Sequence, residues 1–537
     1  MNISEQFIKD LIDQGVDTFF GVQGGACARL VDNVVKYKGR FIPVLNEQSA
    51  GFYAHGYYMS SGKTAGLIFT TGPGLTNGIS GIAACYYDRV PLVVLVGQVG
   101  KKLNIAKKTS TRMVGFQEVP HLDLCNPISD NCLKIDSEKK YLKSRDDFLS
   151  KLHSKVQVVE FLDDVQRIKI QKKFTKYKNK SHIKSKSHSK KILELIKKSI
   201  NPTIILGAGC SHDNNSEYLT KIITKTKINT CCTWGAQNLQ KYFSKNNFFY
   251  GLMGNHNPGI ANKILVKSDL ILAVGCSLLQ HQAGKDLKEF ATNSKIIFVN
   301  NDLRECKRAV KQFGKRLIIH NVNAKDFIIS LKNIRKANLN IIPNISLNKT
   351  KYPVNILKTI FKKISKNSII FADAGATLSW TFQAANSFYT CPSIFTSFNL
   401  HSMGYANCAS IGAKVISKKN IFCIIGDGSV PMNSQEFSWI KKYPFKMIII
   451  DNNGYGIIRQ TQRAFYKSKF YGSDFLNKDS KMPNFSLEKI LSSYLIDYKV
   501  ISKKKINNED INWFLASKKS KALIIKIDYN SEVSTEV

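Results

Sequence analysis

The sequence has no apolar run long enough to cross a membrane. Its longest apolar runs, such as PLVVLVG from Pro91 and KMIIID from Lys446, have the length of a β-strand, whereas a spanning helix needs about 20 apolar residues. The residues before Gly15 predict an amphipathic helix and not a secretory signal peptide. The sequence therefore predicts a cytoplasmic protein without membrane contact.

The twelve cysteines lack the spacing of a metal site. No two of them form a CxxC pair, and only Cys231 and Cys232 are adjacent, which argues against structural zinc. We expect reduced, mostly buried thiols, as is usual in the cytosol.

Acidic residues are scarce, because 39 Asp and Glu stand against 79 Lys and Arg, a net charge of +40. Concentrated on one face, this excess would favour a nucleic-acid partner. The lysines are instead spread through the chain, and no basic block alternates with regularly spaced aromatic residues. We therefore expect no nucleic-acid partner.

At 537 residues, 43% of them hydrophobic, the chain is long enough for roughly two to four packed domains.

Short apolar runs alternate with amphipathic helices through most of the chain, a pattern typical of parallel sheets. Helices are expected over 48–61 and 75–87. The expected strands lie near 41–45, 65–70, 91–96, 203–207, 269–274, 295–299, 368–372, 420–425 and 446–451.

A segment rich in lysine and serine interrupts this pattern at 169–190 and predicts a linker. We therefore predict an α/β protein with three consecutive doubly wound parallel-sheet domains. Their predicted bounds are 1–168, 191–335 and 350–537.

The strongest functional pattern is a pair of polar turns that follow two neighbouring strands. Gly426-Asp427-Gly428 ends one predicted strand, and Asn452-Asn453 ends the next. Because ligands of parallel sheets bind at the carboxyl ends of the strands, we expect the two turns to meet there. A carboxylate, an amide oxygen and a backbone carbonyl suit Mg²⁺, and Gly428 lets phosphate oxygens approach the backbone. The alternative is that both are ordinary turns.

These motifs resemble those of thiamine-diphosphate-dependent enzymes of the acetolactate synthase family. The resemblance extends over nearly the whole chain, through NEQSAGFYAHGY from Asn46, TTGPGLTNGISGIAACYYDRVPLVVLVGQ from Thr70, GLMGNHNPGIAN from Gly251 and SMGYANCASIGAK from Ser402. It implies a pyrimidine-binding, a central and a diphosphate-binding domain. It also implies decarboxylation of a 2-keto acid, with pyruvate as the expected donor, and transfer of the two-carbon unit to a carbonyl acceptor.

The resemblance assigns a role to individual residues. Glu47 is the catalytic carboxyl group that shares a proton with the aminopyrimidine ring, and a desolvated carboxyl suits that task; the alternative is a helix-start carboxylate. Asp427, Asn453 and the Tyr455 carbonyl are the implied Mg²⁺ ligands. The implied cofactor-binding residues are Gly375, Ala376, Thr377, His401 (through its carbonyl), Met403, Gly426, Asp427, Gly428, Ser429 and Asn453. The implied substrate-side residues are Gly24, Gly25, Phe116 and Gln117.

In this family the pyrimidine-binding domain of one subunit faces the diphosphate-binding domain of another. The resemblance therefore implies a homodimer or homotetramer with active sites at the subunit interface.

The segment NNGYGIIRQTQ departs from the biosynthetic acetolactate synthases, in which a Trp stands at the position of Thr461. It is more similar to the carboligases found with surface-polysaccharide genes. With Arg459, Gln460 and Gln462 beside it, Thr461 predicts a wide, polar mouth for a keto-sugar acceptor, with pyruvate as the alternative acceptor.

Three questions stay open at this point. FAD binding is one, because Gly207 and Gly275 are kept while Ser211 and Ser277 stand where relatives often have Arg. The second is a simple 2-keto-acid decarboxylase, for which His55 and His121 are poorly placed candidates. The third is a catalytically silent paralogue, against which Glu47 and Asp427 argue.

Overall fold

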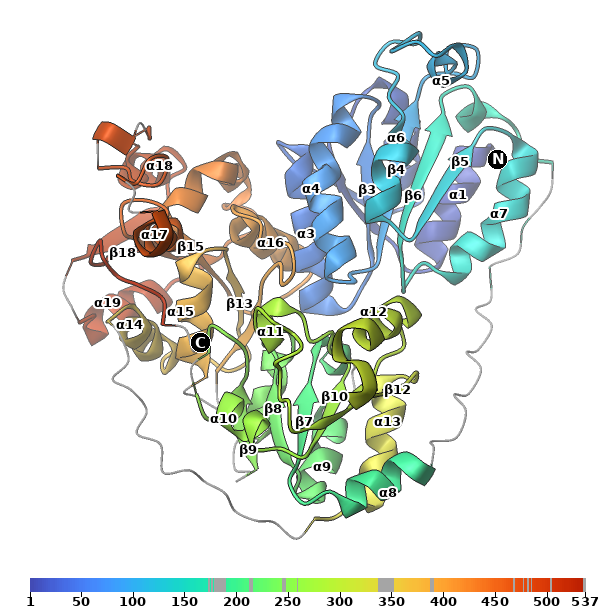
Figure 1. Cartoon of the computed structure of the whole chain (residues 1–537). Coiled ribbons are helices and arrows are strands. Elements are labelled where there is room, and N and C mark those ends of the chain that lie inside the picture. Colours follow the sequence, from blue (N-terminus) through green and yellow to red (C-terminus); the bar gives the residue numbers. More distant parts are fainter. Residues whose placement is uncertain are drawn as a thin grey trace.

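The computed structural model of the chain describes residues 1–171, 174, 177, 190–211, 216–243, 248–257, 259–336, 352–386, 391–466, 469–476, 478–480, 482–483, 485–502 and 505–534. Most of the linker predicted at 169–190 and the start of the domain predicted at 350 lie outside the described residues. The described residues form three α/β units in chain order, coloured blue to cyan, green to yellow, and orange to red (Figure 1).

Each unit is built on a six-stranded sheet in which every strand pair is parallel. The first sheet, ordered β2-β1-β3-β4-β6-β5, contains β1 (Thr18–Gly21), β2 (Arg40–Pro43), β3 (Ala65–Phe69), β4 (Leu92–Gln98), β5 (Asn131–Ile135) and β6 (Val156–Leu162). The second, ordered β12-β11-β10-β7-β8-β9, contains β7 (Pro202–Leu206), β8 (Asn229–Cys232), β9 (Phe249–Leu252), β10 (Leu270–Val274), β11 (Lys295–Val299) and β12 (Leu317–His320). The third, ordered β14-β13-β15-β16-β18-β17, contains β13 (Ile369–Ala372), β14 (Ser393–Phe395), β15 (Ile421–Gly426), β16 (Lys446–Asp451), β17 (Asp497–Ile501) and β18 (Lys521–Lys526).

Helices cover both faces of the sheets (Figure 1). The first unit has α1 (Ile3–Asp13), α2 (Ala28–Lys36), α3 (Glu47–Ser61), α4 (Pro73–Tyr87), α5 (Ala106–Thr109), α6 (His121–Cys125) and α7 (Glu138–Ser150). The central unit has α8 (Lys190–Lys198), α9 (Ser216–Thr226), α10 (Ile260–Val266), α11 (Gln280–Ala283), α12 (Leu303–Phe313) and α13 (Ala324–Ser330). The third has α14 (Tyr352–Phe361), α15 (Ala376–Ala385), α16 (Tyr405–Lys414), α17 (Gly456–Thr461), α18 (Leu487–Ser493) and α19 (Asn508–Leu515).

The central strands of each sheet are continuous apolar runs because helices cover them on both sides. Every residue of β4, β7, β10 and β16 is buried. All twelve cysteines are unpaired, and all except Cys132 are buried, as the sequence predicts for most of them. The predicted fold of three parallel α/β units is also confirmed.

The first and third units touch through α3 and α16, which lie side by side (Figure 1). Gly56 of α3 and Gly412 of α16 make this close approach possible. A Cβ atom on Gly56 would collide with the carbonyl of Ala409, and one on Gly412 with that of Tyr53. The backbones of the two helices therefore meet directly, which fixes the start of α3 against the third sheet.

Candidate active site

A cavity of about 350 Å³ opens at the carboxyl ends of β13, β15 and β16. These strands are neighbours in the third sheet, and Gly426 pairs with Ile450. This register places the turn after β15 beside the turn after β16, as the strand pattern predicts.

Most of the residues predicted to hold the cofactor lie on the wall of this one cavity. They are Gly375, Ala376, Thr377, His401, Met403, Gly426, Asp427, Gly428, Ser429 and Tyr455. The exception is Asn453, which has a left-handed backbone (φ 56°) and is not part of the wall. Its neighbours Asn452 and Gly454 take that place.

Asp427 is the one carboxylate among the described residues of the wall. Its Oδ1 accepts a hydrogen bond from Gly428 N and its Oδ2 one from Gly454 N, both at 2.8 Å. Burial, and after it the nearby Asp451 carboxylate, raises the pKa of Asp427 to about 7. A divalent cation at this carboxylate would offset both effects, so the environment fits a metal ligand.

Helix α15 begins at the same cavity. Gly375 precedes its first residue with φ +85°, and no atom lies within 4 Å of the position that a Cβ would take there. The amino end of a helix attracts anions through its free N–H groups and its dipole. The cavity therefore combines an anion-binding helix end with the cation-binding carboxylate of Asp427.

The loop that carries His401 and Met403 is fixed from two sides. Asp373 accepts hydrogen bonds from Gly404 N (3.1 Å) and Ala406 N (2.8 Å). Asp88, which follows α4 of the first unit, accepts from Phe398 N (2.7 Å) and from Asn399 N (2.9 Å). The first unit therefore helps to shape the cavity of the third.

The central unit contributes a wall that the sequence did not reveal. Trp234, His256 and His281 line the cavity opposite the turns of the third sheet. These residues follow β8, β9 and β10 and are far apart in the sequence. Only the contact between the units brings them together. His256 lies in the motif GLMGNHNPGIAN, whereas no local pattern marks Trp234 or His281.

Glu47 lies outside this cavity, at the first turn of α3. It is 9% exposed, and its Oε2 accepts a hydrogen bond from Asn77 Nδ2 of α4 at 3.1 Å. The preceding backbone is anchored by Glu436 of the third unit, whose Oε1 accepts from Leu45 N (2.9 Å) and Asn46 N (3.2 Å). Glu436 is a buried positioning residue that the sequence did not single out.

The predicted substrate-side residues gather at one end of the first sheet. A Cβ on Gly24 would contact the Thr70 side chain, while the position beside Gly25 is open. The carbonyl of Gln117 accepts a hydrogen bond from Thr71 Oγ1 at 2.8 Å. Phe116 is 79% exposed and does not enter any part of the third-unit cavity.

The two histidines considered for a decarboxylase are fully buried and paired. His55 Nε2 lies 2.9 Å from Asp88 Oδ2, and the Tyr405 hydroxyl lies 2.7 Å from His55 Nδ1. His121 Nδ1 lies 2.9 Å from Glu160 Oε2, and its Nε2 accepts from Gly72 N at 3.1 Å. Both imidazoles hold the fold together and have no position left for a substrate.

The prediction of a polar mouth around Thr461 is wrong for one residue, Arg459. Arg459 is 0% exposed, and its guanidinium donates to Asn452 O (2.7 Å), Asn453 O (2.8 Å) and Tyr529 O (3.1 Å). Its hydrogen bonds to the carbonyls of Asn452 and Asn453 hold the turn after β16 in place. Thr461 is exposed, as expected.

A second cleft, of about 520 Å³, lies where the strand order of the central sheet reverses, beside β7 and β10. Its described charged wall residues are Asp88, Arg89 and Glu305, and Arg89 is paired with Asp302 at 2.6 Å. Its only described cation is therefore already paired, and the phosphates of FAD would depend on the backbone N–H groups of the turns at Gly209 and Gly275.

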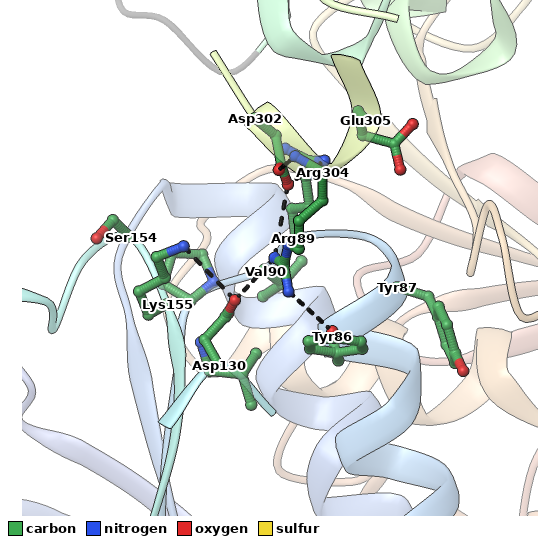
Figure 2. Close-up of a pocket in the computed structure, with 12 residues that line it drawn as sticks. Tyr86, Tyr87, Arg89, Val90, Asp130, Ser154, Lys155, Asp302, Arg304 and Glu305 are labelled. Atoms are coloured by element: carbon green, nitrogen blue, oxygen red, sulfur yellow. Dashed lines mark hydrogen bonds and ion pairs between the residues drawn. The ribbon is translucent and has the colours of Figure 1, made fainter. Parts of the chain in front are cut away.

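Beside this cleft, Figure 2 shows a smaller hollow of about 270 Å³ at the end of α4. Ion pairs cross it between the first and central units. Arg304 lies 3.0 Å from Asp130, and Lys155 lies 3.5 Å from the same carboxylate. These charged groups are paired with one another, so they connect the two units and leave no unpaired charge among them to bind a ligand.

Comparison with protein families identifies the class. Residues 1–119 match the N-terminal TPP binding domain of thiamine pyrophosphate enzymes, residues 189–315 the central domain, and residues 373–525 the C-terminal TPP binding domain. Together the three matches cover well over half of the chain. The chain belongs to the thiamine pyrophosphate enzymes.

Curated relatives narrow this class. The chain is 29% identical to a probable acetolactate synthase large subunit of Methanococcus aeolicus, over 99% of this chain and 93% of the relative. It is 27% identical to the acetolactate synthase large subunit of Lactococcus lactis, over 90% and 86%. These relatives confirm the resemblance to acetolactate synthases that the motifs predict.

A solved structure supports the fold alone. The thiamine diphosphate-dependent 4-hydroxybenzoylformate decarboxylase of Rhodococcus jostii RHA1 is similar with a TM-score of 0.77 at 16% identity, over 99% of this chain and 100% of that one. No helix among the described residues is both long enough and apolar enough to span a bilayer.

Proposed function

We propose that the protein is a carboligase that decarboxylates a 2-keto acid, with pyruvate as the donor, and transfers the two-carbon unit to a carbonyl acceptor. The observation that carries this proposal is the cavity at Asp427, which unites an anion-binding helix end with a carboxylate in a thiamine pyrophosphate enzyme. Thiamine diphosphate supplies the electron sink for such a decarboxylation. The residues described here bind it and exclude water.

Asp427 and the amino end of α15 would hold the diphosphate and its Mg²⁺. We propose Asn452, beside Asn453, as an amide ligand, because Asn452 lies on the wall and Asn453 does not. A carbonyl of the turn at Gly454 or Tyr455 would complete the protein ligands, all of them oxygen atoms as Mg²⁺ prefers.

The active site needs a second copy of the chain. Glu47 does not line the cavity of its own chain, so the pyrimidine end of the cofactor must meet Glu47 of a partner. Apolar side chains are exposed beside both halves, among them Phe116 (79%) near the first and Ile458 (46%) near the second. A homodimer, or a homotetramer built from dimers, would cover them.

A complementation experiment tests this arrangement. Glu47→Gln and Asp427→Asn each inactivate one half of every site. Mixed and refolded together, the two variants should regain up to about a quarter of wild-type activity, because a hybrid dimer carries one intact site. No recovery in verified hybrids would show that each site belongs to one chain.

The acceptor is proposed to be a keto-sugar or another hydroxylated carbonyl compound. Thr461 is exposed and lies in α17, the helix whose residues Ile457 and Ile458 line the cavity, so we propose that its small side chain leaves the entrance open. The proposal also requires that CO₂ release from pyruvate depend on both thiamine diphosphate and Mg²⁺. Release that persists in chelator-treated protein would remove the metal assignment.

A second candidate is a decarboxylase that releases an aldehyde. The imidazoles of His256 and His281 on the cavity wall favour it, since they could provide a proton. The identity of the product separates the two candidates.

A further inference from the structure

The side of the cavity formed by the central unit offers hydrogen bonds without positive charge. Trp234, His256 and His281 form this side, which we call the central wall, and His401 of the third unit adjoins it. Among the described residues that line the cavity, none is Lys or Arg. A ligand against the central wall therefore meets donors and acceptors and no fixed cation.

Two polar atoms of the central wall have no hydrogen-bond partner within the described part of the chain. They are Trp234 Nε1 and His256 Nδ1, and both are buried. Trp234 is only 8% exposed. Leaving buried polar atoms unpaired is unfavourable, and both residues line the cavity, Trp234 also the second cleft, so these atoms are candidates for hydrogen bonds with a bound ligand.

The central wall is held rigidly. The Trp234 ring stacks on Phe382 of the third unit with centroids 4.5 Å apart and planes at 6°. The His256 carbonyl accepts from Gln383 Nε2 at 2.9 Å, and the His281 carbonyl accepts from Asn255 N at 3.1 Å. A preorganised surface of this kind loses little conformational entropy when a ligand binds.

The three imidazoles are uncharged near neutral pH. Burial lowers the pKa of His281 to about 4, with a further contribution from His401. Burial also lowers the pKa of His256 and that of His401. Each neutral ring has one N–H donor and one acceptor nitrogen, the complement of hydroxyl and carbonyl groups, and His281 Nε2 already lies 3.3 Å from Gln282 Nε2.

We propose that Trp234, His256 and His281 bind the acceptor, and that this acceptor is a neutral hydroxylated ketone or aldehyde and not a 2-keto acid. This inference rests on the proposed carboligase function. The carboxylate of the donor pyruvate is lost as CO₂, whereas the carboxylate of a keto-acid acceptor would remain at a wall that has no Lys or Arg to receive it. The hydroxyl groups of a sugar would instead pair with Trp234 Nε1 and His256 Nδ1.

The test uses pyruvate as donor and compares two acceptors, dihydroxyacetone and 2-oxobutyrate, on the loaded enzyme. Trp234→Phe removes the N–H group and keeps the ring stacked on Phe382. It should raise the KM for dihydroxyacetone about 2- to 12-fold, the value of one neutral hydrogen bond. Thiamine diphosphate affinity and CO₂ release without acceptor are measured in the same variant, so that a loss confined to the KM for dihydroxyacetone can be told from a loss of cofactor. His153→Gln, outside the cavity, is the matched control.

His281→Arg gives the opposite test, because it places a cation on the central wall. It should shift the ratio of kcat/KM values toward 2-oxobutyrate by about tenfold or more. A wild-type preference for 2-oxobutyrate, or an unchanged KM for dihydroxyacetone in Trp234→Phe, would overturn the inference.

A failure of the proposed carboligase function gives a different result from a failure of the inference about the central wall. If the wild-type protein releases no CO₂ from pyruvate, the carboligase proposal falls. Saturation-transfer NMR of dihydroxyacetone on the loaded wild-type and Trp234→Phe proteins then tests the central wall by itself. Equal signals from the two proteins would overturn the inference.

Discussion

Replacing Glu47 by Gln tests how the first unit activates the cofactor. The amide keeps the size of the side chain and can still accept from Asn77 Nδ2, which lies 3.1 Å from Glu47 Oε2. It cannot share a proton with a ring nitrogen. We expect kcat to fall about 10²–10⁴-fold, equivalent to about 3–5 kcal/mol of transition-state free energy, while thiamine diphosphate still binds.

The assay is steady-state CO₂ release from pyruvate, with cofactor affinity measured separately by fluorescence titration. Glu138→Gln is the matched control, because Glu138 is the first residue of α7 as Glu47 is of α3. Both variants lose the same interaction with a helix dipole, worth about 0.3–1 kcal/mol. If Glu47→Gln keeps more than about a third of wild-type kcat, Glu47 is only a helix-start carboxylate and the reasoning is wrong.

Three further outcomes are expected. Asp427→Asn should weaken Mg²⁺-dependent cofactor binding by at least about 100-fold in calorimetry, since even outer-shell losses reach that size; unchanged affinity would exclude Asp427 as a ligand. Because burial holds the pKa of His281 at about 4, against 6.5 for a free imidazole, the unfolded chain binds a proton that the folded chain lacks between these values. Stability should therefore fall as the pH drops through this window, by up to about 1.4 kcal/mol per unit, and urea denaturation of His281→Gln should show a smaller slope. Arg459→Met leaves three carbonyls without their donor and should cost about 3–5 kcal/mol of unfolding free energy, a loss that thermal denaturation would reveal and that Arg459→Lys should partly restore.

The sequence predicted the fold, and it placed the turns at Asp427 and Asn452 at one edge of a sheet, because both depend on local patterns. Strand-length apolar runs followed by amphipathic helices are specific for parallel sheets, and the turns of such sheets meet at one edge. Asp427 follows its strand directly, so its position was fixed by that rule. Thr377 and Met403 were placed by motif and lie on the same wall.

Two departures from the predicted site have physical causes. Asn453 stays a predicted ligand, and Asn452 is proposed beside it because β16 stops at Asp451, so that Asn452 is the first residue beyond the strand. Arg459 looked like a surface cation because long charged side chains are mostly exposed. It is buried because three backbone carbonyls receive its guanidinium.

The central wall could not be predicted, since it forms only where two units meet. Trp234 and His281 belong to different turns of one sheet and face a cavity built by another. Neither residue lies in a periodic or spaced motif that points to that cavity. A contact between residues this far apart in the sequence produces no motif that can be recognised in either segment.

The most direct test of the proposed function is the fate of labelled pyruvate. Purified protein with thiamine diphosphate, Mg²⁺ and pyruvate labelled with ¹³C at C2 and C3 is incubated with equal concentrations of dihydroxyacetone and 2-oxobutyrate, and the products are identified by NMR. We predict that most of the label appears in a two-carbon unit joined to dihydroxyacetone, with less in acetolactate and in the 2-oxobutyrate product. Label that appears mainly as acetaldehyde would show a simple decarboxylase and contradict the carboligase proposal.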